Sequence, residues 1–104
     1  MIQLYREKIY HSVTDLSSIL KKWRSDKKNI VFTNGCFDIL HIGHLSYLEY
    51  AKSKGDILII GLNTDKSIKV IKDDSRPINS EYDRAYILVS LAYIDAVILF
   101  DEDT

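Results

Sequence analysis

Apolar positions along this chain follow two patterns, helical spacing and short unbroken runs. Helical spacing predicts a helix over residues 12–28, where one face collects Leu16, Ile19, Leu20 and Trp23. Ser12 or Thr14 would cap its start, since a hydroxyl at that place accepts a backbone N–H of the first turn. Residues 1–11 follow neither pattern and are expected to form a loosely packed lead-in.

Three unbroken apolar runs have the length of buried strands, and polar turn residues follow each of them. These runs are residues 30–33, 56–62 and 96–100. The segments between them predict helices at residues 40–54, 66–72 and 80–93. Ser80 and Asp83 have the spacing of a capping box at the start of the last helix.

The order of these elements, a helix followed by β-α-β-α-α-β, predicts the fold class. Strands that alternate with helices form a parallel sheet with helices packed on its faces. We therefore expect an α/β, Rossmann-like fold with a parallel sheet and helices on both faces. We divide the chain into a lead-in with its helix, residues 1–28, and a main domain, residues 29–104.

The composition of the chain mainly excludes classes of function. The chain has 104 residues and a formal net charge of −1, so it has no overall field that would attract nucleic acid or a membrane surface. Charges interrupt its first residues, unlike a signal peptide, and its apolar runs are too short to cross a bilayer. Cys36 is the only cysteine, so no internal disulfide can form. We expect a cytoplasmic protein without nucleic-acid or membrane partners.

Two of the three histidines, His41 and His44, stand where the first strand gives way to a helix. Ligands of parallel sheets bind beyond the carboxyl ends of the strands, and a helix start favours anions. Residues i and i+3 share a helix face, so both imidazoles can donate hydrogen bonds to one polyphosphate. Gly35 would let the backbone turn tightly, and Gly43 would let a ligand approach.

The same residues permit other interpretations. His41, His44 and Asp38 make a metal site with two histidines and one carboxylate conceivable, although helical metal pairs more often have i, i+4 spacing. Both histidines could also be incidental surface residues. Cys36 could be a nucleophile, but no activating base is evident, and an unpaired cysteine is usually a small buried residue.

A longer stretch, FTNGCFDILHIGHLSYLEYAKSKGD, places His-x-Gly-His shortly after Phe-Asp. It resembles the small nucleotidyltransferases of the cytidylyltransferase-like superfamily. Within that group the chain is most similar to bacterial D-glycero-β-D-manno-heptose 1-phosphate adenylyltransferases. The features that favour this branch are the helix before the first strand, the segment LNTDKSIKVIKDDSRPIN and the acidic FDEDT. The resemblance covers nearly all of the chain.

The resemblance implies that ATP and a sugar 1-phosphate give an ADP-sugar and pyrophosphate. The sugar would be the heptose, and the product would be ADP-heptose for lipopolysaccharide. The sugar phosphate would attack the α-phosphorus in line without a covalent enzyme intermediate, so positioning and charge stabilisation would provide catalysis. Mg²⁺ would accompany ATP, held mostly by phosphate oxygens and water.

The resemblance also assigns roles to residues. The expected catalytic residues are His41, His44 and Lys72. The expected nucleotide-binding residues are Asn34, Gly35, Cys36, Phe37, His41, Gly43 and His44. The expected contacts to substrate or phosphate are Asp38, Asn63, Asp65, Arg76 and Arg84.

Structural roles stay open for several of these residues. Asp38 could be a loop-capping carboxylate, and Lys72 a solvated lysine at a helix end. Asn63 and Asp65 could cap the short helix that follows them.

Arg84 lies in the first turns of the last predicted helix, where a cation opposes the helix dipole. This placement favours an anion contact. A salt bridge from Arg84 to Glu81 or Asp83 would explain it equally well.

Two departures from the family pattern bear on activity. Asp73 stands where the family loop usually has glycine, which would stiffen the loop and add negative charge near the phosphates. The family domain also continues with further strands, so the sheet is expected to be truncated after the third predicted strand. Residues 30–33 would then form an exposed apolar edge that favours self-association, for instance as a homodimer.

Three other functions are compatible with parts of the sequence. A CTP-dependent enzyme similar to glycerol-3-phosphate cytidylyltransferase would share the motif, because the base-selecting residues lie largely past Thr104. A catalytically silent nucleotide-binding or dimerising module would follow from an incomplete cleft. An aminoacyl-tRNA synthetase fragment also carries His-Ile-Gly-His, but Lys-Met-Ser-Lys-Ser is absent here.

Overall fold

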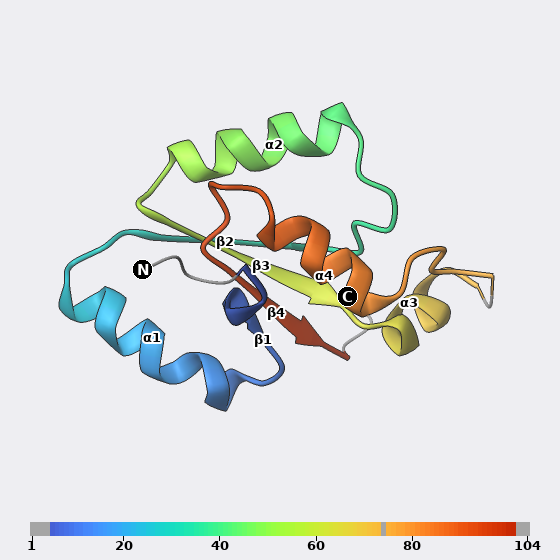
Figure 1. Ribbon diagram of the computed structural model, residues 1–104, viewed down its shortest axis with the longest axis horizontal. Coiled ribbons are helices and arrows are strands. Elements are labelled where there is room, and N and C mark those ends of the chain that lie inside the picture. Colours follow the sequence, from blue (N-terminus) through green and yellow to red (C-terminus); the bar gives the residue numbers. More distant parts are fainter. Residues whose placement is uncertain (1–4, 74, 102–104) are drawn as a thin grey trace.

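The computed structural model of the chain describes residues 5–73 and 75–101 (Figure 1). After a short 3₁₀ helix, Tyr5–Lys8, it contains β1 (Ile9–Tyr10), α1 (Val13–Ser25), β2 (Ile30–Gly35), α2 (Ile42–Ser53), β3 (Ile57–Asn63), α3 (Asp65–Ile71), α4 (Glu81–Val89) and β4 (Ala96–Phe100). Every helix and strand expected from the sequence is present, and most of their bounds are shifted by one or two residues.

The described strands form one parallel sheet in the order β1-β4-β3-β2. Figure 1 shows α2 above the strands, α1 below them and α4 across them; α2 and α4 pack on one face of the sheet and α1 on the other. The apolar run of β3 explains this arrangement, because every one of its residues is buried. Leu58 and Ile60 pack toward α2 and α4, whereas Ile57 and Ile59 pack toward α1. The predicted α/β fold with a parallel sheet and helices on both faces is confirmed.

Two expectations about the elements are wrong. The lead-in contains β1, in which Ile9 and Tyr10 pair with β4, and a strand of two residues is too short to show a period in the sequence. The last helix ends at Val89 rather than near residue 93, because Leu91 and Ile94 turn into the core before β4 begins. The division of the chain at residue 28 remains a prediction.

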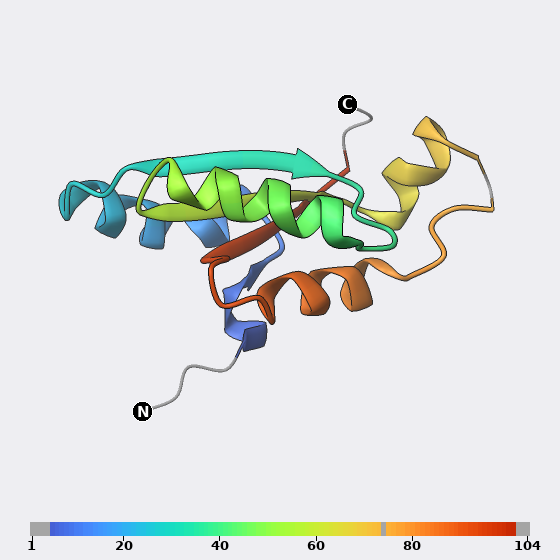
Figure 2. The ribbon, with the colours of Figure 1, turned by 90° about the horizontal axis from the view of Figure 1, so that it is seen from above.

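The carboxyl ends of the strands point toward one end of the molecule, where α2, α3 and α4 begin (Figure 2). Each of the last two helices begins at a hydroxyl side chain. Thr64 accepts the backbone N–H of Ser67 at 3.3 Å, and Ser80 accepts that of Asp83 at 3.2 Å. Thr64 caps α3, so the expected caps Asn63 and Asp65 are not needed there.

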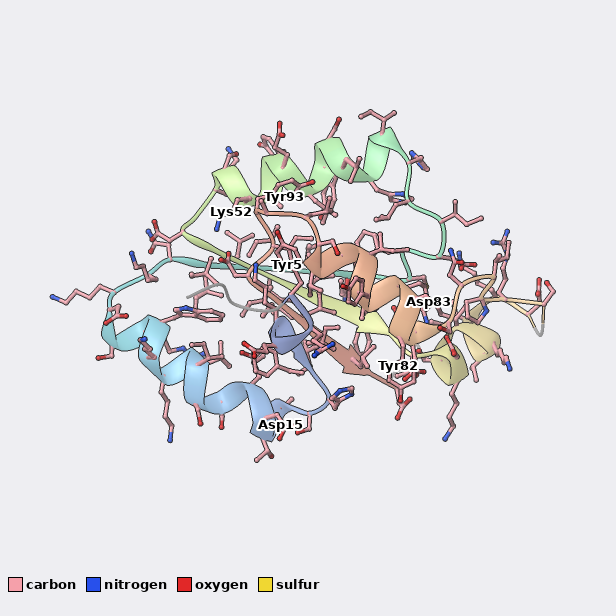
Figure 3. All side chains as sticks on the ribbon, viewed as in Figure 1. Tyr5, Asp15, Lys52, Tyr82, Asp83 and Tyr93 are labelled. Atoms are coloured by element: carbon pink, nitrogen blue, oxygen red, sulfur yellow. The ribbon has the colours of Figure 1, made fainter. Side chains whose placement is uncertain are left out.

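α2 is tied near both of its ends to the segment that enters β4. The ammonium group of Lys52 lies 2.7 Å from the carboxylate of Asp95, which also accepts the Leu58 backbone N–H at 2.8 Å. The Tyr93 hydroxyl donates to the Leu45 carbonyl at 3.2 Å. Figure 3 labels Lys52 on α2 and Tyr93 on the segment between α4 and β4. These contacts set the direction in which α2 crosses the sheet.

β2 forms the outer edge of the described sheet, and Phe32 on this strand is 58% exposed. A groove of about 730 Å³ separates this edge from α1 and extends to Phe100. α1, with 13 residues, is the longest helix in the described ranges, and none of the helices there is long and apolar enough to cross a membrane.

We predict that the 104-residue chain self-associates through β2, because the unpaired backbone groups of an edge strand can pair with another chain. Phe32→Lys should lower the mass measured by light scattering toward that of a monomer. Val70→Lys is the matched control, since Val70 is 66% exposed on α3, and it should leave the mass unchanged. A wild-type chain that stays monomeric at every concentration would contradict this prediction.

Candidate functional site

His41 and His44 meet at the start of α2, with their ring centroids 4.1 Å apart. Nδ1 of His41 accepts the backbone N–H of Gly43 at 3.0 Å. Nδ1 of His44 accepts the backbone N–H of His41 at 3.2 Å. The two histidines thus form a capping box, a pattern that usually combines Ser or Thr with Glu or Gln.

These capping bonds decide which ring nitrogens can bind a ligand. A nitrogen that accepts an N–H bond holds a lone pair, so each neutral ring carries its proton on Nε2. Burial, and then repulsion from His41, lower the pKa of His44 below its ordinary value of 6.5, which keeps His44 neutral at neutral pH. The pair therefore offers two adjacent Nε2–H donors, an arrangement suited to phosphate oxygens.

The two glycines of this segment make room for neighbouring aromatic rings, and the ligand approach expected at Gly43 remains a prediction. A Cβ on Gly43 would lie 2.8 Å from Cε1 of His41, so glycine makes room for the capping ring. A Cβ on Gly35 would lie 2.8 Å from the ring of Phe37. No described glycine has a positive φ, and the tight turn expected at Gly35 is instead made by Phe37, whose φ is 44°.

Phe37 supports the histidine pair from the core side. A left-handed backbone is strained for a bulky residue and persists only where the surroundings hold it. The ring of Phe37 is buried and meets that of His44 edge-on, with centroids 5.7 Å apart. Beside it, the Cys36 thiol lies 3.8 Å from Oδ1 of Asn63 and does not contact a basic side chain through any described hydrogen bond.

Asp38 ties this turn to the loop before α4. Its carboxylate accepts the backbone N–H groups of Ile78 and Asn79, each at 2.9 Å. The guanidinium of Arg76 adds a bond of 3.1 Å to the same carboxylate. Burial opposes the charge, but the donors from Asn79, Ile78 and Arg76 outweigh it and lower the pKa of Asp38.

The carboxylate of Asp38 thus acts as a loop cap, the structural alternative considered from the sequence. Both of its oxygens are engaged, which argues against a metal site shared with the histidines. Within residues 5–73 and 75–101, no three His, Cys, Asp or Glu side chains converge to hold a metal ion. The side-chain amide of Asn79 adds a bond of 2.7 Å to the Asp38 carbonyl. Sequence reasoning missed this pairing, since no spacing rule links residues so far apart.

Arg84 is wholly buried, so the expected contact to a ligand anion is wrong, and its ion pair is with Asp65 rather than with the expected Glu81 or Asp83. Its guanidinium donates to the Asn79 carbonyl at 3.0 Å, the Cys36 carbonyl at 2.8 Å, the Asn63 carbonyl at 2.7 Å and the Asp65 carboxylate at 2.7 Å. These four acceptors come from three different loops at the carboxyl end of the sheet. Arg84 therefore joins the loops rather than meeting a ligand.

The remaining predicted site residues lie at the same end in different environments. Asn63 is buried as the last residue of β3. Lys72 is exposed at the end of α3, Asn34 is exposed near the end of β2, and Arg76 has a side chain that is 40% exposed. The ligand contacts expected of these residues remain predictions. Asp73 accepts the Ser75 backbone N–H at 2.8 Å, and the expected stiffening of the loop stays a prediction.

Known proteins match this chain in sequence and in fold. A family model described as Cytidylyltransferase-like matches residues 32–104. A relative named Bifunctional protein HldE, from Aliarcobacter butzleri (strain RM4018), is 56% identical over 90 residues, which are 86% of this chain and 19% of that protein. The protein of the same name from Helicobacter pylori (strain J99 / ATCC 700824) is 52% identical over 103 residues, 99% of this chain and 22% of that protein. The chain thus spans about a fifth of the length of these relatives.

A solved structure also matches. The crystal structure of the lipopolysaccharide core biosynthesis protein from Thermoplasma volcanium GSS1 superposes with a TM-score of 0.61 and 32% sequence identity. The superposition covers 70% of this chain and 58% of that chain.

We predict that His41 and His44 are Nε2–H tautomers, because each Nδ1 accepts a backbone N–H. Imidazole ¹⁵N–¹H correlation spectra at mildly alkaline pH should show this tautomer for both rings. His11, outside the capping box, is the internal control and should show averaged tautomers. Protonated Nδ1 atoms in both His41 and His44 would refute the capping geometry.

We predict that Asp38 makes the fold sensitive to acid. Because its pKa is lower in the folded chain, it stabilises the fold fully above the ordinary value of 3.8, and this contribution is lost as the pH falls through the folded pKa. Asp38→Asn should lower the free energy of unfolding by about 1–3 kcal/mol at neutral pH. It should also reduce the further loss of unfolding free energy between about pH 5 and pH 2, measured in urea titrations.

Asp26→Asn is the control for this titration, because Asp26 is exposed at the end of α1. It should leave the acid dependence of the unfolding free energy as in the wild type. If Asp38→Asn loses stability in acid as steeply as the wild type, Asp38 does not hold the loops.

Proposed function

The chain belongs to the cytidylyltransferase-like family, and from this premise we propose that it is a nucleotidyltransferase that transfers AMP from ATP to D-glycero-β-D-manno-heptose 1-phosphate. The products would be ADP-heptose and pyrophosphate. The observation that carries the proposal is the pair of adjacent Nε2–H donors of His41 and His44 at the start of α2. The Thermoplasma volcanium protein is named for lipopolysaccharide core biosynthesis, which agrees with a heptose as acceptor.

In the proposed reaction an oxygen of the sugar phosphate attacks the α-phosphorus of ATP. The bond from the α-phosphorus to the bridging oxygen breaks on the opposite side, and pyrophosphate leaves. His41 and His44 donate to oxygens around the α- and β-phosphates, where negative charge grows. Because both rings are held by backbone bonds before the ligand arrives, little reorganisation is needed in the transition state.

Lys72 would add a positive charge from the end of α3, where its side chain is exposed. Arg76 could reach a phosphate with the N–H groups that do not face Asp38. Mg²⁺ would arrive with ATP and neutralise phosphate charge. Since the described residues provide no cluster of three metal ligands, phosphate oxygens and water would form most of its coordination shell.

Transfer of CMP from CTP to glycerol 3-phosphate is the second candidate, since the matching family model is named for cytidylyltransferases. A silent nucleotide-binding or dimerising module is the third, because the chain spans only about a fifth of its relatives. The histidine pair is compatible with all three.

Pyrophosphate release separates these candidates. We expect release with ATP and the heptose 1-phosphate, and none with CTP and glycerol 3-phosphate. His41→Ala and His44→Ala should each lower the rate at least about 100-fold, as expected for the loss of a transition-state donor. His11→Ala is the matched control and should leave the rate unchanged.

Faster release with CTP and glycerol 3-phosphate would support the second candidate instead. Calorimetric binding of ATP without any release would support the silent module. Wild-type rates in both histidine variants would remove these side chains from the reaction.

A further inference from the structure

Arg84 is a charged group inside the protein that the proposed reaction does not use. Its side chain is 0% exposed, and its only charged partner within residues 5–73 and 75–101 is Asp65, whose side chain is 34% exposed. Burying a charge is costly unless hydrogen bonds and a counter-ion compensate it. Three backbone carbonyls supply most of this compensation. They place the guanidinium at the junction of the loops rather than in the centre of the core.

One of these carbonyls belongs to the residue before Phe37, whose ring contacts the histidine pair. Arg84 donates to the carbonyl of Cys36 at 2.8 Å, immediately before the left-handed residue Phe37. The ring of Phe37 then meets His44 edge-on. Arg84 also bonds the carbonyl of Asn79, the residue whose N–H groups hold Asp38 on the far side of the same turn.

We propose that Arg84 is a positioning residue of the nucleotide site. It holds residues 36–38 in their strained turn, and through Phe37 it keeps the His44 ring in the orientation that presents Nε2–H. This inference rests on the proposed function for its consequence in nucleotide binding. Its geometric part, the support of His44, is independent of any ligand.

Lysine would not replace this arginine. The four acceptors come from three different loops, and the planar guanidinium reaches them with separate N–H groups in a fixed fork. An ammonium group has three donors at one point, so at least one carbonyl would lose its bond. Arg84→Lys therefore keeps the charge and releases part of the turn.

The test compares Arg84→Lys with Leu16→Ala, both fully folded by circular dichroism. Leu16 is buried on the opposite face of the sheet, so its replacement lowers stability without touching the turn. Arg84→Lys should weaken Mg²⁺–ATP binding in calorimetry about tenfold or more, the scale expected for a misplaced binding group. It should also abolish the nuclear Overhauser contact between the rings of Phe37 and His44. Leu16→Ala should preserve both.

If Arg84→Lys keeps the wild-type affinity and the ring contact, Arg84 is only a core residue and the proposal is wrong. If Arg84→Lys does not fold, Asp65→Asn gives the same test, because it removes the charged partner at a half-exposed position. An unchanged ring contact in that variant would also overturn the proposal. If the wild-type chain fails to bind ATP, the proposed function fails, and the ring contact alone decides the role of Arg84.

Discussion

The candidate site depends on a turn of three residues, 36–38, that is held from two sides by buried charges. Arg84 binds the carbonyl at its start, and the carboxylate of Asp38 at its end binds backbone N–H groups of the loop before α4. Each charge needs these partners because an unpaired ion in the interior would be costly. The same bonds that satisfy the two charges therefore hold Phe37 in a conformation it would not adopt alone.

This turn also positions the two histidines. Phe37 lies against His44, and the two imidazoles cap the first turn of α2 through their Nδ1 atoms. Histidine in a capping box has a consequence that serine and glutamate would not have. Once Nδ1 accepts a backbone N–H, the remaining nitrogen is a neutral donor that points away from the backbone. The same two side chains thus cap the helix and would serve the proposed phosphate binding.

Several features of the fold followed from the sequence alone. The unbroken apolar run at residues 56–62 predicted a strand covered on both faces, and the spacing of Leu16 and Leu20 predicted one face of a helix. Local hydroxyl caps marked the helix starts at Ser12 and Ser80. β1 was not predicted, because two residues are too few to show the alternation of a strand. Only pairing with β4 makes them a strand.

For the site, the sequence by itself determined that two histidines share one face at the start of a helix, since that follows from spacing within a single element. Tertiary structure decided what surrounds them. Asp38 and Asn79 are joined across 41 positions, and Arg84 meets carbonyls from loops that are separate in the chain. Exposure of a charged side chain depends on which segments fold over it, and no local pattern encodes that. For this reason Arg84, expected at the ligand, lies beneath the site and supports it.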